Sequence, residues 1–324
     1  MKKWVFWLAA LALLAALQAS LRGLIGAYNY QIVILVGINV ILAVSLNLIN
    51  GFTGQFSIGH AGFYAVGAYS SASFVYYGGA SIRALTGFLP AMAQNAVLLL
   101  LGLFAAAAAA GIAGLAVGIP SLRLRGDYLA IVTLGFGEII RVLILNIDAI
   151  GGSRGFSGIP QLSNFFWVYL VVLITIVTIH NLVHSSYGRA FISIRDDEIA
   201  AEAMGVDTTR VKVLSFVISS MFAGIAGGLF AHYTMYLHPN SFLFTTSFYL
   251  IIMIVVGGLG SIEGAVVGAV LVTVTLEVFR GFGAFRLVNF AVLLVLIMIY
   301  RPQGLMGSWS LFKTRQKNPV AVMK

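Results

Sequence analysis

The chain has 324 residues, of which 60% are hydrophobic and 9% carry a charge, whereas a typical soluble domain carries about 25% charged residues. A soluble domain of this length cannot hide so much apolar surface, so the composition indicates an all-α, polytopic membrane protein. The sequence has no cysteine, which excludes a disulfide, a thiolate metal site and a cysteine nucleophile. The net charge of +9 fits Lys and Arg residues in the cytoplasmic loops of a membrane protein.

Apolar blocks fill most of the chain in sequence order. Because a membrane-spanning helix needs roughly 20 mainly apolar residues, we predict a bundle of about ten spans. They lie near residues 4–20, 30–49, 61–77, 95–118, 128–147, 165–183, 211–236, 245–257, 264–279 and 287–300. Most Lys and Arg residues then fall on the side of both termini, which predicts cytoplasmic termini in a bacterial inner membrane. Residues 1–20 also fit a cleavable signal peptide, whose removal leaves the later alternation unchanged.

Two glycine-rich stretches resemble each other: GQFSIGHAGFYAVGA at 54–68 and GGLGSIEGAVVGA at 257–269. Glycine-broken helices at matching places in two halves are typical of a transport pathway. Ordinary close packing of glycine-rich helices explains the same pattern. On the first interpretation, uncharged polar side chains hydrogen-bond a passing solute without holding it tightly. The predicted pathway residues are Asn47, Asn50, Thr53, Gln55, Ser57 and His60.

The spacing of the ionisable residues Glu138 and Arg141 puts both on one face of a predicted span. We interpret them as a neutralising intramembrane ion pair and not as a proton relay. His180 and His184 have the spacing of metal ligands, but no third ligand lies nearby in sequence, so no metal site is predicted. The scarcity of buried ionisable residues argues against an ion-coupled carrier, and the lack of a convergent set of reactive side chains argues against an intramembrane enzyme.

Half of the acidic residues lie in one predicted cytoplasmic loop, residues 184–212. This loop belongs to a predicted transmembrane domain of residues 1–310, which is followed by a cytoplasmic tail of residues 311–324. Ser193 and Asp196 have the spacing of a capping box, and Gly205 is a stop signal. These signals predict a short amphipathic helix over 194–204, whose small apolar face suits a groove on another protein. The alternative is a helix lying flat on the membrane. The predicted docking residues are Arg195, Glu198, Ile199, Ala200, Glu202, Ala203, Met204 and Gly205.

Several fragments, taken together and in this order, resemble the permeases of branched-chain amino acid ABC importers. They are NLINGFTGQFSIGHAGFYAVGAY at 47–69, RGDYLAIVTLGFGEIIRV at 126–142, GGSRGFSGIP at 151–160, GRAFISIRDDEIAAEAMGVDTTRVKVLSF at 188–216, GGLGSIEGAVVGA at 257–269 and YRPQGLMG at 300–307. The stretch that begins RGDYLAIVTLGFGE is similar to the M-type member of the permease pair (LivM) and less to the H-type member (LivH).

The resemblance implies a permease subunit, not an enzyme, that carries leucine, isoleucine or valine delivered by a periplasmic binding protein. It also implies a second permease subunit as a heterodimer partner, and two cytoplasmic subunits that bind ATP. No cofactor is expected in this chain, whose sequence contains no P-loop motif. By resemblance, Glu202, Ala203 and Gly205 lie in the coupling helix that engages the ATPase. The alternatives are a related ABC importer for urea, short amides or another small solute, and an ion-coupled secondary carrier.

Overall fold

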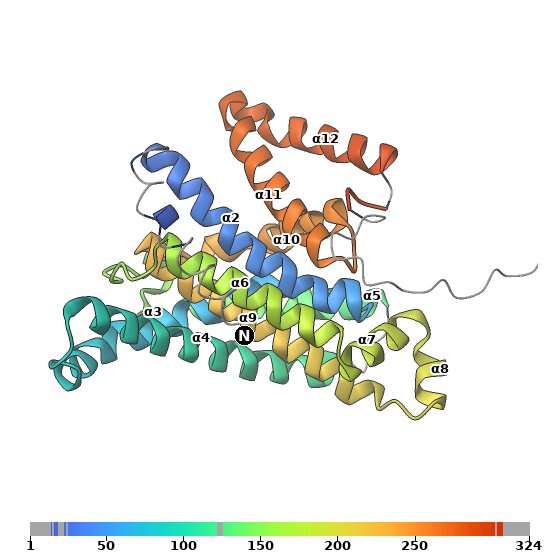
Figure 1. The fold of residues 1–324 in the computed structure, drawn as a ribbon, viewed down its shortest axis with the longest axis horizontal. Coiled ribbons are helices and arrows are strands. Elements are labelled where there is room, and N and C mark those ends of the chain that lie inside the picture. Colours follow the sequence, from blue (N-terminus) through green and yellow to red (C-terminus); the bar gives the residue numbers. More distant parts are fainter. Residues whose placement is uncertain are drawn as a thin grey trace, which may run out of the picture.

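The structure is a computed structural model that describes residues 14, 16–18, 23, 25–121, 126–301 and 303–306. Within these residues the only strand-like pairing is an isolated bridge between Phe156 and Leu237, so the all-α prediction is confirmed. Figure 1 shows long helices running side by side. The α-helices are α2 (Gly26–Asn47), α3 (His60–Leu85), α4 (Ala91–Ser121), α5 (Asp127–Leu145), α6 (Phe165–Val183), α7 (Ser186–Asp196), α8 (Glu198–Ala203), α9 (Thr208–Thr234), α10 (Phe244–Gly257), α11 (Ile262–Val278) and α12 (Arg286–Tyr300).

Shorter helical turns join several of these helices. A π-helix, η1 (Leu48–Phe52), continues α2, and the other turns are 3-10 helices. They are η2 (Asp148–Ile150), η3 (Gly152–Arg154), η4 (Pro239–Phe242) and η5 (Phe279–Phe285).

Seven helices among the described residues are long and apolar enough to cross a membrane, so the predicted count of about ten is not confirmed. The predicted span 4–20 lies largely outside the described residues, as does the whole predicted tail 311–324. The predicted span 61–77 is helical, as part of α3, but its run of Ser, Tyr and Gly residues lowers its hydropathy. The predicted span 287–300 forms α12, which has 15 residues and is shorter than a full span.

The centre of the bundle is the packing of α9 against α3 and α4. A Cβ atom added at Gly67 of α3 would lie 2.2 Å from the Cα atom of Gly224 in α9. One added at Gly227 would lie 2.2 Å from the carbonyl oxygen of Tyr64. Small residues therefore let the backbones of α3 and α9 touch, as membrane helices often do.

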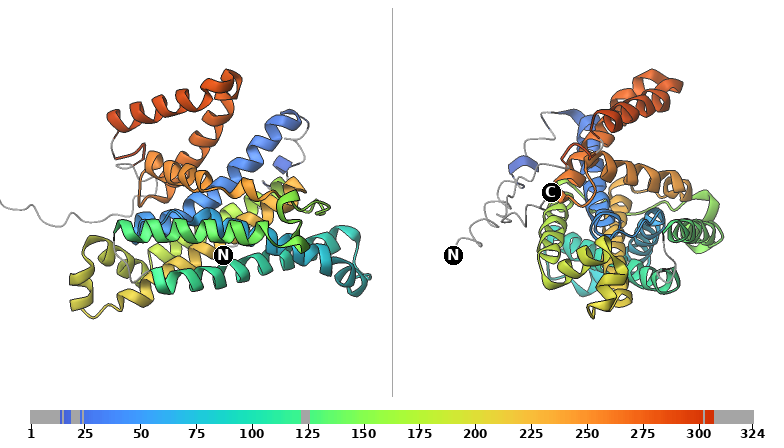
Figure 2. Two further views of the ribbon diagram at one scale, coloured as in Figure 1. Left: turned by 180° about the vertical axis from the view of Figure 1, so that it is seen from behind. Right: turned by 90° about the vertical axis from the view of Figure 1, so that its right-hand side faces the viewer.

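The α11–α12 hairpin projects from this bundle (Figures 1 and 2), although α11 packs against α2 and α10. In α12, Phe290 is buried, whereas most of the other large apolar side chains of this helix are exposed. A helix exposed in this way requires lipid or another apolar helix around it.

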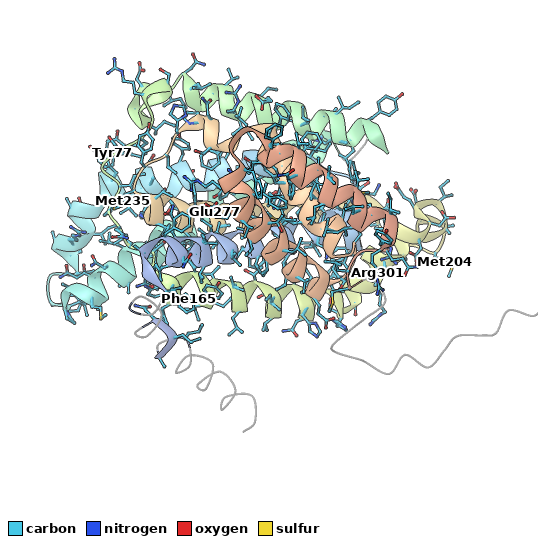
Figure 3. All side chains as sticks on the ribbon, turned by 90° about the horizontal axis from the view of Figure 1, so that it is seen from above. Tyr77, Phe165, Met204, Met235, Glu277 and Arg301 are labelled. Atoms are coloured by element: carbon cyan, nitrogen blue, oxygen red, sulfur yellow. The ribbon has the colours of Figure 1, made fainter. Side chains whose placement is uncertain are left out.

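The loops lie at two opposite ends of the molecule. Figure 3 shows Met204 and Arg301 at one end and Tyr77 and Met235 at the other. The predicted topology likewise puts Met204 and Arg301 on one face of the membrane. It puts Tyr77 and Met235 on the opposite face.

Candidate coupling and pathway site

The two glycine-rich stretches form two helix connections. The first glycine segment (residues 53–59) joins η1 to α3, and the second glycine segment (residues 258–261) joins α10 to α11. Gly54, Gly258 and Gly260 have φ values of +71°, +123° and +75°, which side chains with a Cβ atom rarely adopt. The glycines are therefore required by the backbone of these connections. Whether the helices on either side form single broken spans remains a prediction.

Two asparagines, one turn apart, each hold one glycine segment through a pair of hydrogen bonds. Asn47 Nδ2 donates to the carbonyl oxygen of Ser261 at 2.9 Å, and the amide of Gly260 donates to Asn47 Oδ1 at 3.0 Å. Asn50 Nδ2 donates to the carbonyl oxygen of Ser57, and the amide of Ser57 donates to Asn50 Oδ1, both at 3.2 Å. The two amide groups thus tie the backbone of both glycine segments to the end of α2 and to η1.

The second glycine segment also lies close to η1. A Cβ atom added at Gly51 of η1 would lie 2.4 Å from the amide nitrogen of Gly260. The far side of the second segment meets the end of the described chain, because the amides of Leu305 and Met306 donate to Val256 and Gly257 carbonyls at 2.8 and 3.0 Å. The second glycine segment is thus enclosed by chain segments from both halves of the sequence.

The six predicted pathway residues divide into two groups by their hydrogen bonds. Asn47 and Asn50 have the bonds described above, and the Thr53 hydroxyl donates to the carbonyl of Leu48 at 2.8 Å. Both amide atoms of Gln55, the Ser57 hydroxyl and Nδ1 of His60 are buried without a partner. His60 uses its other ring nitrogen, Nε2, in a 3.0 Å contact with Ser45 Oγ.

Unpartnered buried polar atoms are rare, because each costs about 1–3 kcal/mol when it is removed from water. Of the nine such atoms among the described residues, four lie within residues 55–60. This stretch is beside Thr133 of α5 and Ser247 of α10, whose hydroxyls accept from the amides of Ile58 and Ala61. This part of the first glycine segment can therefore hydrogen-bond a polar molecule that enters the bundle.

The predicted helix over 194–204 is two helices, which corrects the boundaries drawn from the sequence. Helix α7 continues through Asp196, Asp197 is extended with φ −160° and ψ 109°, and α8 begins at Glu198. The N-cap is Asp197, whose Oδ1 accepts from the amides of Ile199 and Ala200 at 2.9 and 3.0 Å. The Ser193 hydroxyl instead donates within α7 to the carbonyl of Ala190 at 3.0 Å, so the predicted capping box does not form.

The apolar face of α8 points away from the bundle. Ile199 is 69% exposed and Met204, just after the helix, is 85% exposed, whereas Ala201 on the opposite face is 5% exposed. Ala200, Glu202 and Ala203 are exposed as well. Gly205, with φ +87°, follows the last turn and donates to the carbonyl of Glu202 at 3.0 Å, in agreement with the predicted stop.

Two contacts that sequence reasoning missed attach this region to the bundle. Lys212 Nζ of α9 lies 2.5 Å from Glu198 Oε2 of α8, and the Lys212 side chain is only 7% exposed. Arg195, assigned to the docking helix from the sequence, lies in the last turn of α7, and its Cγ atom lies 2.8 Å from where a Cβ atom on Gly54 would stand. The sequence gives a weak signal for the Lys212–Glu198 contact, because Lys212 lies one turn into an apolar helix that follows an acidic loop. No sequence pattern indicates that Arg195 lies beside Gly54.

Arg141 Nε donates to Glu138 Oε2 at 2.7 Å on the half-buried face of α5. An unpaired charge within the membrane costs about 2.5–3.5 kcal/mol. We therefore expect Glu138→Gln and Arg141→Gln each to lower the folded yield, and the double variant to recover much of it. Size-exclusion profiles of the detergent-extracted variants measure this. Normal folding of Glu138→Gln with loss of transport would instead make Glu138 a transport residue.

No group of three His, Cys, Asp or Glu side chains that could hold a metal ion occurs in the part of the chain that the structure describes. The rings of His180 and His184 lie 4.1 Å apart at the end of α6. A pair without a third protein ligand is not a typical zinc site.

Comparison with known proteins gives a consistent set of relatives. The family described as branched-chain amino acid transport system / permease component matches residues 29–300. The chain is 40% identical over 304 residues to the high-affinity branched-chain amino acid transport system permease protein LivM of Salmonella typhimurium. The matched region covers 83% of this chain and 68% of the relative. It is 28% identical over 312 residues to a probable LivM permease of Methanocaldococcus jannaschii, covering 83% of this chain and 90% of the relative.

More distant similarity extends to the permease protein LivH of Escherichia coli, which is 28% identical over 162 residues, or 49% of this chain and 52% of the relative. No solved structure matches the chain. The resemblance inferred from the sequence fragments, including its M-type character, is confirmed.

Proposed function

Because this chain belongs to the family of branched-chain amino acid transport system permease components, we propose that it is the M-type transmembrane subunit of an ATP-driven importer in a bacterial inner membrane. The names of its relatives support leucine, isoleucine and valine as substrates. A second, H-type permease completes the pathway, since the chain resembles both LivM and LivH proteins. Two cytoplasmic subunits bind ATP, and a periplasmic protein delivers the amino acid.

The exposed apolar face of α8 is the observation that carries this proposal. With Ile199 of α8 69% exposed and Met204, just after the helix, 85% exposed, this face contributes little apolar burial in the isolated chain. The face is too short and too small to anchor in a membrane surface, where bulky apolar residues are typical. It suits a groove on an ATPase subunit, in the manner of a helix docked in a partner.

The pathway passes Gln55 and Ser57 of the first glycine segment and His60, the first residue of α3. Their unpartnered buried atoms offer both donors and acceptors, which suit the ammonium and carboxylate groups of a zwitterionic amino acid. The other three predicted pathway residues hold this part of the chain in place, because their polar atoms already bond within the chain. They are Asn47, Asn50 and Thr53.

Single cysteines test the pathway, because the chain has none of its own. We expect a water-soluble thiol reagent to label Gln55→Cys and Ser57→Cys in the assembled transporter, with rates that change when ATP or amino acid is added. Ala43→Cys, fully buried in α2, is the matched control and should stay unlabelled. If both test positions resist the reagent in every nucleotide state, the first glycine segment is packing and not pathway.

A further inference from the structure

Arg195 lies beside both glycine segments at once. Its Cα, Cβ and Cγ atoms lie 3.1, 3.1 and 2.8 Å from the position of a Cβ atom on Gly54. Its Nη1 atom lies 3.3 Å from the position of a Cβ atom on Gly260. The absence of side chains at 54 and 260 therefore gives this arginine its place, in addition to allowing the positive φ angles.

The same residue stands two positions before the N-cap of α8. Its guanidinium donates to Asp196 Oδ1 from Nε at 3.1 Å and from Nη2 at 2.9 Å. Both bonds use the side of the guanidinium that carries Nε and Nη2, which leaves Nη1 for the contact at Gly260. The Arg195 side chain, which is 39% exposed, thus connects the chain just before α8 to the two glycine segments.

The glycine segments are in turn tied to each other. Asn47 holds Gly260 and Ser261, and Asn50, one turn later, holds Ser57. A displacement of Arg195 therefore acts on both segments together. The ion pair between Glu198 and the buried Lys212 forms a separate connection, from α8 to α9.

We propose that Arg195 is a positioning residue that transmits movement of α8 to the two glycine segments, and so couples ATP hydrolysis to opening of the pathway. The inference rests on the proposed function. It assigns to Arg195 a role toward the inside of the bundle, in place of the ATPase contact expected from the sequence. The docking face of α8 then binds the ATPase, and Arg195 converts that binding into a rearrangement around Gly54 and Gly260.

The test measures the ratio of amino acid imported to ATP hydrolysed in vesicles that contain the complete transporter. We expect Arg195→Ala to lower this ratio by about tenfold or more, since coupling between sites typically changes equilibria by ~5- to 150-fold. Arg210→Ala is the control, because Arg210 lies in the same loop, is 87% exposed and pairs only locally with Asp207. This control should keep the ratio of the unaltered chain.

A second readout follows the pathway directly. In a Ser57→Cys background, thiol labelling should change on addition of ATP in the unaltered chain and in Arg210→Ala, but should not respond to ATP in Arg195→Ala. A residue that only stabilises the fold would change the amount of protein and leave this response intact.

If Arg195→Ala does not assemble, Arg195→Gln decides the question. Glutamine keeps the Cβ and Cγ atoms over Gly54 but does not reach Gly260, so it should also lower the transport-to-hydrolysis ratio. An unchanged ratio and an unchanged labelling response in either variant would overturn the role of Arg195. Absence of uptake by the unaltered complex would instead count against the proposed function itself.

Discussion

Replacing Ala200 or Ala203 with glutamate is expected to abolish uptake and to prevent co-purification of the ATPase, while the protein still inserts into the membrane. Both alanines lie on the exposed face of α8, which the bundle does not use. In a docked complex, a new carboxylate there would be buried against the partner without a counter-charge. Unpaired buried charges cost about 3–5 kcal/mol, which is enough to lose more than a hundredfold in affinity.

The control is Thr209→Glu, which adds the same charge to an exposed position in the same loop. Thr209 lies in the first turn of α9, where the helix dipole favours a carboxylate. Pull-down of the ATPase from detergent extracts, with uptake in parallel, measures both effects. Retention of ATPase binding and uptake by Ala200→Glu and Ala203→Glu would show that α8 is not the docking helix.

Replacing Gly67 with alanine is expected to reduce strongly the amount of folded protein. The added methyl group would lie 2.2 Å from both the Cα atom and the carbonyl oxygen of Gly224. Backbone atoms cannot move aside as a flexible side chain can, so α3 and α9 must separate. Overpacking typically costs about 1–3 kcal/mol and occasionally more, and here it acts on the central helix contact of the bundle.

Gly135→Ala is the matched control, because no atom lies within 4 Å of a Cβ atom at this position of α5. Alanine is favoured over glycine in a helix by up to about 1 kcal/mol, so this variant should be unchanged or slightly more stable. Thermal unfolding in detergent compares the two variants. Equal melting temperatures and equal yields would mean that α3 and α9 do not cross in the way the structure describes.

Much of the fold follows from the sequence, because apolar run length and glycine content are local properties. The helices from α4 to α6 lie close to their predicted ranges for this reason. Helix ends are less predictable, as the stretch around α7 and α8 illustrates. Ser193 has cap spacing, but its hydroxyl bonds to its own helix, while the extended backbone of Asp197 creates the actual N-cap. The Ser193–Asp196 spacing pointed to a different cap, and it does not record the backbone conformation at Asp197.

The candidate site is predictable in location but not in detail. Polar residues near glycines marked the first glycine segment, yet their hydrogen bonds depend on residues far away in sequence. Asn47 bonds to Gly260 and Ser261 across more than 200 positions, and Arg195 lies beside Gly54 and Gly260 from α7. No local periodicity records such contacts. The structure therefore separates supporting residues from Gln55, Ser57 and His60, which have buried side-chain atoms without a partner.

Transport by the assembled system tests the central claim most directly. The chain is reconstituted in vesicles with its H-type partner permease and the two ATP-binding subunits, and radiolabelled leucine is supplied with its periplasmic binding protein. The proposed function predicts leucine accumulation that requires ATP, the binding protein and this chain together, and that persists when ion gradients are collapsed with ionophores. Accumulation that follows an ion gradient in the absence of ATP, or ATP hydrolysis without accumulation of any branched-chain amino acid, would contradict it.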